Sequence, residues 1–89
     1  MTDADIRQLA AIADRPTVSD VWPVVEALRS RGWHFDLDDY TYPGAPPKRW
    51  TAAFAKRCTE THKPGEPRVY ATAVEPAAAI LRAALQAVG

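Results

Sequence analysis

The sequence predicts an α+β fold, a two-layer sandwich in the order α-β-β-β-α with a three-stranded antiparallel sheet and two helices on one face, plus a short N-terminal helix. Two segments, one before and one after the middle of the chain, repeat apolar residues at helical spacing. Three segments between them alternate apolar and polar residues as strands do. The links between these strands are short and rich in proline and glycine, which favours antiparallel pairing.

A short helix is predicted over residues 3–13, where Ile6, Leu9 and Ala13 recur at helical intervals. It ends before Pro16, because the residue preceding a proline disfavours helical geometry. Being terminal and rich in alanine, this helix is expected to attach loosely. We therefore assign residues 1–16 to an N-terminal helical extension and residues 17–89 to the sandwich domain.

The next helix is predicted at about residues 20–31, with Ser19 or Asp20 as its N-cap. Pro23 then falls in the first turn, where a missing amide hydrogen costs little, and Gly32 supplies the stop. Its apolar stripe consists of Val21, Val24, Val25 and Leu28.

Three strands are predicted at 33–40, 50–58 and 68–74, and the proline-rich segment 41–49 is expected to be an irregular loop. Alternation assigns one set of side chains to the helix-covered face: Trp33, Phe35, Leu37, Trp50, Phe54 and Val69. The last helix opens at Glu75-Pro76, with proline in the first turn and an acid beside the positive helix end.

Composition limits both class and location. The chain is 47% hydrophobic with a net charge of zero, but residues 1–40 sum to minus four and residues 41–74 to plus four. The single Cys58 cannot form an intramolecular disulfide, and no apolar run approaches the roughly 18 residues of a membrane span. The N-terminus lacks the basic-then-apolar order of a secretory signal. We expect a cytoplasmic protein with no membrane partner.

Three segments, "VWPVVEALRSRGWHFDL", "WTAAFAKR" and "YATAVEPAAAILRAALQA", together resemble the phage ABA-sandwich domain, a small α-β-β-β-α protein of bacteriophages and prophages. The resemblance spans roughly residues 20–88 and rests on a helix ending in Arg-Gly-Trp, a strand opening with tryptophan, and an alanine-rich helix after Glu-Pro. It implies a phage or prophage origin, hence the host cytoplasm, and the sandwich fold. It implies no activity, no cofactor and no functional residues.

Candidate chemistry is sparse. His34, Asp36 and Asp38 share one strand face, but residues two apart on a strand lie about 6.5–7 Å apart, too far to close easily on one ion. We interpret this row as the solvated side of a half-buried sheet. Cys58 and His62 have a zinc-like spacing without further ligands nearby. Because a nucleophile elbow and a phosphate-binding glycine loop are both missing, we predict a non-enzymatic protein without cofactor or metal.

The prediction for function is protein–protein binding by a phage or prophage accessory protein, with a protein of the phage, the host or its defences as partner. The segment "YTYPGAPPKRW" interleaves aromatic residues with prolines and a basic pair, and tyrosine, tryptophan and arginine are enriched at interface hot spots. The alternative is a stiff surface connection. The candidate partner-binding residues are Tyr40, Tyr42, Lys48, Arg49, Arg57 and Tyr70.

Two other partners stay open. A nucleic-acid-binding module would use the basic segment 48–68, and double-stranded-RNA-binding domains have the same element order, but here the last helix starts with Glu75 instead of lysines. A homodimer would lay two open sheet faces together, with Asp36 and Asp38 expected opposite Arg57 on the neighbouring strand.

Overall fold

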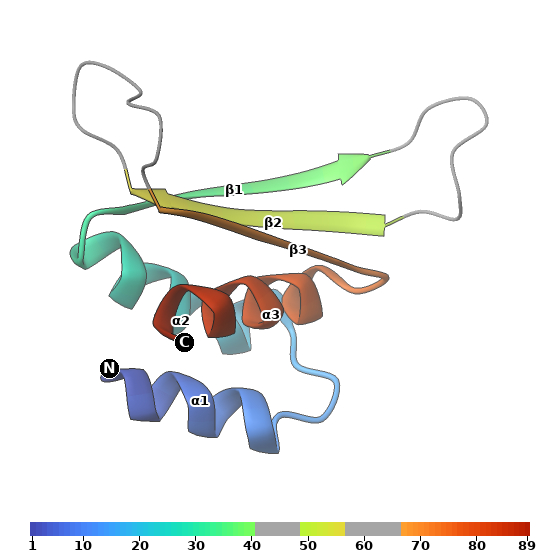
Figure 1. Cartoon of the computed structure of the whole chain (residues 1–89). Helices are drawn as coiled ribbons and strands as arrows, with labels where there is room; N and C mark the ends of the chain where they lie inside the picture. The colour runs from blue at the N-terminus through green and yellow to red at the C-terminus, as the bar shows by residue number, and fades with distance from the viewer. Residues whose placement is uncertain (41–48, 57–66) are drawn as a thin grey trace.

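The computed structural model describes residues 1–40, 49–56 and 67–89. Its elements follow the order α1 (Asp3–Ile12), α2 (Val18–Ser30), β1 (Trp33–Tyr40), β2 (Arg49–Lys56), β3 (Arg68–Ala73) and α3 (Pro76–Val88). Figure 1 shows one sheet with α2 and α3 on a single face, and α1 beyond those helices. The predicted α+β sandwich is confirmed.

The start of α2 differs from the prediction. Thr17, rather than Ser19 or Asp20, is the N-cap, and Asp20 takes the third helical position. The Asp20 amide donates to Thr17 Oγ1 at 3.2 Å, and the Thr17 amide donates to Asp20 Oδ2 at 2.8 Å. This reciprocal pair satisfies two amides at once, which a cap at Ser19 would not do. The hydrogen bond from the Thr17 amide to the Asp20 carboxylate, and then the nearby Thr17 side chain, lower the pKa of Asp20 below its ordinary value of 3.8.

The turn from α2 into β1 confirms the predicted stop. Gly32 has φ +91°, a left-handed conformation that L side chains rarely adopt, and its amide donates to Arg29 O at 3.0 Å. The chain therefore enters β1 at Trp33 without strain at this position.

The sheet has the order β1-β2-β3, and both pairs are antiparallel. The register places Phe35 beside Phe54 and Phe54 beside Val69, so the predicted inward residues share one face. β2 begins one residue earlier than predicted, because Arg49 pairs with Tyr40. β3 ends at Ala73, one residue before the predicted end.

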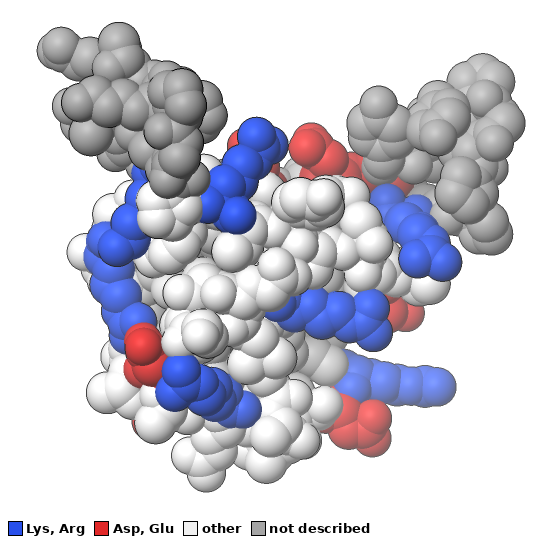
Figure 2. All heavy atoms as spheres, viewed as in Figure 1, with Lys and Arg blue, Asp and Glu red and all other residues white. Residues whose placement is uncertain are grey.

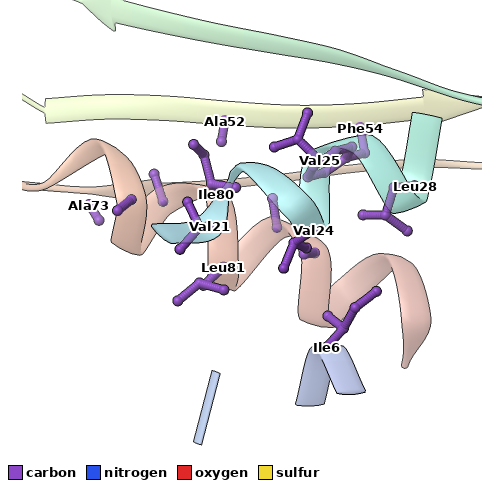
Figure 3. Packing of buried hydrophobic residues seen from close by; sticks show 14 residues of the cluster. Ile6, Val21, Val24, Val25, Leu28, Ala52, Phe54, Ala73, Ile80 and Leu81 are labelled. Carbon is purple, nitrogen blue, oxygen red and sulfur yellow. The ribbon is translucent and has the colours of Figure 1, made fainter. Parts of the chain in front are cut away.

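The core lies between this sheet face and the helices. Figure 3 shows the buried side chains gathered there, from the sheet, from α2 and from α3. Phe54 is fully buried, and the ring centroids of Phe35 and Phe54 lie 5.1 Å apart. The other predicted inward residues pack against this cluster while staying half-buried: Trp33, Phe35, Leu37, Trp50 and Val69.

The N-terminal helix shares the same core. Ile6 is fully buried, and it enters the cluster from the side opposite the sheet (Figure 3). Arg7 donates to Val88 O at 2.6 Å, and Arg31 binds both Asp3 and the Met1 carbonyl. The expectation of a loosely attached α1 is therefore wrong: a buried isoleucine and three polar contacts tie it to α2 and α3.

Candidate functional site

The sheet face opposite the helices is the candidate protein-binding surface, and we call it the open face. None of its side chains is buried, whereas Ala52, Phe54 and Ala73 on the other face are. Its members alternate with the core residues along each strand: His34, Asp36 and Asp38 on β1, Arg49, Thr51, Ala53 and Ala55 on β2, and Arg68, Tyr70 and Thr72 on β3.

The strand register arranges the open face in three columns. His34, Asp36 and Asp38 on β1 form one column, which we call the acidic column. β2 carries Arg49 followed by small residues, and β3 carries Arg68, Tyr70 and Thr72. Asp36 lies opposite Ala53, which lies opposite Tyr70, and Asp38 lies opposite Thr51. The expected pairing of these aspartates with Arg57 is wrong, because the strand register pairs them with Ala53 and Thr51, which come earlier in β2.

The described part of the predicted site falls on this face. Arg49 is exposed at the first position of β2 beside Tyr40, the last residue of β1, and Tyr70 is 65% exposed on β3. Arg49 and Tyr70 thus stand on the same face of adjacent strands, but not side by side, because Tyr70 pairs with Ala53, four residues along β2 from Arg49. Three further candidates lie outside the described residues: Tyr42, Lys48 and Arg57.

The row of His34, Asp36 and Asp38 is exposed on β1, as predicted for the solvated side of the sheet. Within residues 1–40, 49–56 and 67–89, no group of three or more His, Cys, Asp or Glu side chains is placed to hold a metal ion. Cys58 and His62, the zinc-like pair of the sequence, lie outside these ranges.

The outer edge of β3 is closed by α3. Arg82 Nη1 donates to Thr72 O at 3.1 Å, and Gln86 Nε2 donates to Tyr70 O at 2.9 Å. Residues four apart on a helix are separated by about 6 Å, and residues two apart on a strand by about 6.6 Å, so the two spacings match. We call Arg82 and Gln86 the edge caps.

The outer edge of β1 carries the opposite arrangement. Lys56 N donates to Pro67 O at 3.0 Å, so Lys56 turns its backbone towards β3. The backbone groups of successive strand residues point to opposite sides, so Ala53 and Ala55 direct theirs towards β1. Their partners His34 and Asp36 therefore hydrogen-bond to β2. Phe35 and Leu37 alternate with them and direct their amides and carbonyls away from the sheet. No described residue is seen to hydrogen-bond these outward groups of Phe35 and Leu37.

Apolar surface continues beside this β1 edge. The ring of Trp22 on α2 stands edge-on to Phe35, with centroids 5.9 Å apart and an interplanar angle of 83°. Trp22 is 40% exposed, and Phe35 and Leu37 are only half-buried. We call the exposed parts of Trp22, Phe35 and Leu37 the apolar shoulder of the β1 edge. It lies on the helix side of this edge, and the acidic column lies on the open side.

The described basic residues of segment 48–68 do not gather at one place. Arg49 and Arg68 stand on the open face near different ends of the sheet, whereas Lys56 turns to the helix side with its Nζ 5.3 Å from the Trp33 ring centroid. On the face shown in Figure 2, Lys and Arg side chains form separate groups divided by uncharged surface. The acids of β1 share the open face with the arginines, which opposes phosphate binding there.

A cleft of about 760 Å³ lies on the other side of α3, between the end of α1, the α1–α2 connection and the first turns of α3. Its walls are mainly alanine, leucine and proline, and its charged residues have both signs: Arg15, Glu75 and Arg82. Arg82 already donates to Thr72 as an edge cap. This arrangement selects no ligand chemistry.

Sequence reasoning missed Trp22, Arg82 and Gln86 as surface determinants. The signal for the edge caps is readable: two long hydrogen-bond donors four apart on a helix that follows a strand through a two-residue link, Val74 and Glu75. The contact of Trp22 with Phe35 could not be predicted from either pattern alone, because Trp22 lies on α2 and Phe35 on β1.

No family model matches the chain, and the comparisons with curated proteins and with solved structures also found no match. In the part of the chain that the structure describes, every helix is too short or too polar to cross a membrane.

Proposed function

We propose that this protein acts by binding another protein through the open side of its sheet, without catalysing a reaction. The observation that carries the proposal is the contrast between the two faces: one buries Ala52 and Phe54 under helices, and the other exposes Tyr70 among charged residues. An exposed tyrosine beside small residues gives a flat contact with a polar tip, a combination enriched at protein interfaces.

We further propose that it is an accessory protein of a phage or prophage that works in the host cytoplasm, with a phage, host or defence protein as partner. The support is the resemblance of its α-β-β-β-α segments to the phage ABA-sandwich domain.

Affinity capture with the tagged full chain, followed by mass spectrometry, tests this proposal. We expect a captured protein that is lost with Tyr70→Ala and retained with Ile12→Ala, a matched removal of an exposed apolar side chain, 70% exposed on α1. Equal capture by both variants would place the contact away from the open face. Turnover of a substrate by the purified protein, abolished by a point substitution, would overturn the non-enzymatic assignment.

A further inference from the structure

We propose that the β1 edge binds an extended segment of another protein as a fourth strand, and that apolar residues alternate with lysine or arginine in this segment. The inference rests on the proposed protein-binding function and names the class of partner. Three features of β1 lead to it: its outward backbone groups, its apolar shoulder and its acidic column.

The backbone supplies the pairing. Phe35 and Leu37 direct their amides and carbonyls away from β2, and an edge with such groups is a template for another strand. The β3 edge cannot serve equally, because Arg82 and Gln86 already donate to the carbonyls of Thr72 and Tyr70. One edge of the same sheet is therefore receptive and the other is closed.

The helix side of the β1 edge selects apolar residues. In an antiparallel addition, the partner residues opposite Phe35 and Leu37 would point to the same side as these two side chains. There they would meet the exposed part of Trp22, which already contacts Phe35 edge-on. Every second residue of the partner segment then covers apolar surface that is half-exposed in the free protein.

The open side of the edge selects positive charge. The partner residues between those apolar positions stand opposite Asp36 and Asp38, both exposed. Opposite charges directly across two strands attract, and like charges repel. This disfavours β1 of a second copy as the occupant, because aspartates of the two copies would face each other, and it favours a strand with alternating lysine or arginine.

The probe is a labelled, end-capped peptide of about eight residues, a usual strand length, that alternates valine and lysine. Fluorescence anisotropy with the full chain measures its affinity at low and high salt. The matched peptides are a valine–glutamate alternation and a block peptide of the same valine and lysine content. We expect the alternating basic peptide to bind and both matched peptides to bind at least about tenfold more weakly.

Backbone methylation tests strand addition separately from charge. N-methyl groups on the valines would occupy the amides that face β1, whereas N-methyl groups on the lysines would point away from it. We expect the first peptide to lose binding and the second to keep it. Equal binding by both methylated peptides would show charge attraction without strand pairing and would overturn the inference.

Substitutions in the protein locate the site. Asp36→Lys, exposed at the middle of β1, should weaken the basic peptide at least about tenfold at low salt, and Asp14→Lys, the same charge change on the exposed α1–α2 connection, should weaken it about twofold or less. Circular dichroism checks that both variants fold. Equal weakening by the two variants would also overturn the inference.

The outcome separates this inference from the proposed function. If capture of a protein partner depends on Tyr70 while the peptide fails to bind, the β1 edge is wrong and the protein-binding function stands. If the peptide binds at β1 and capture is independent of Tyr70, the open face is wrong and the edge stands.

Discussion

The two edges of the sheet handle their unpaired backbone in different ways. At β3, side chains of the neighbouring helix donate to the strand carbonyls, so the edge is covered from within the chain. At β1, the backbone of Phe35 and Leu37 faces outward, and the strand carries aspartates on its open side instead. A strand that pairs with β3 must first displace these two side-chain donors, whereas the charge on β1 disfavours only strands that carry negative charge. Selectivity for a partner can therefore reside at β1 and not at β3.

The largest expected effect concerns the core that both edges share. Phe54→Ala should lower the free energy of unfolding by about 3–5 kcal/mol, because it opens a cavity at a fully buried ring in the central strand. Phe35→Ala on the β1 edge should cost less, since Phe35 is half-buried. Urea unfolding of both variants measures the two losses. If Phe35→Ala lost as much free energy of unfolding as Phe54→Ala, or more, the side chain of Phe35 would be as well buried as that of Phe54, against the proposed exposure of the β1 edge.

Opening the β3 edge is expected to have the next largest effect. The double substitution Arg82→Ala with Gln86→Ala removes two side-chain hydrogen bonds and should cost about 1–2 kcal/mol. It should also produce concentration-dependent association, because a second edge is now free to pair. Urea unfolding and sedimentation velocity measure the two effects.

The control for this variant is Arg29→Ala, which removes an exposed arginine whose side chain pairs with Glu26 in the same helix. A double variant as monomeric and as stable as this control would show that the edge caps do not protect β3.

The helices beneath the two edges also differ, and pH reveals this. α2, which contacts β1, has the reciprocal Thr17–Asp20 cap, whereas the N-cap Glu75 of α3 makes no side-chain cap bond. The pKa of Asp20 is lowered in the folded state, so its contribution to stability is present above its ordinary value of 3.8 and is lost as the pH falls through the lowered value. Wild type should melt above Asp20→Ala at neutral pH, and the gap should close in acid.

Asp14→Ala, in the exposed connection before α2, is the control for that pH series. A gap between wild type and Asp20→Ala that stays constant from neutral to strongly acidic pH would mean that the carboxylate charge of Asp20 does not stabilise the cap.

Self-association through the open face has the smallest expected effect. A twofold axis parallel to the strands would bring the acidic column of one copy over Arg68 and Tyr70 of the other. Surface charge pairs contribute only about 0–1 kcal/mol each, so such a dimer would be weak and sensitive to salt. Sedimentation at several concentrations in low salt decides this, and a monomer at tens of micromolar would exclude the homodimer.

The sequence was sufficient to predict the layers, because the alternation in Trp33–Leu37 and the apolar stripe of α2 each depend on one element alone. It was insufficient for contacts that join elements. The N-cap of α2 is Thr17 and not the predicted Ser19 or Asp20, because Thr17 forms reciprocal hydrogen bonds with Asp20. α1 is anchored because Ile6 is buried against other helices. The asymmetry of the sheet edges was missed for the same reason, since Arg82 closes β3 only once α3 lies beside it.

Amide exchange by NMR, with and without the alternating valine–lysine peptide, tests the difference between the two edges most directly. We expect the amides of Phe35 and Leu37 to exchange quickly in the free protein and to become protected when the peptide is bound. The outward amides of Tyr70 and Thr72 on β3 should keep their exchange rates unchanged. Protection that appears at Tyr70 and Thr72 while Phe35 and Leu37 stay unprotected would show that the peptide pairs with β3 and not with β1.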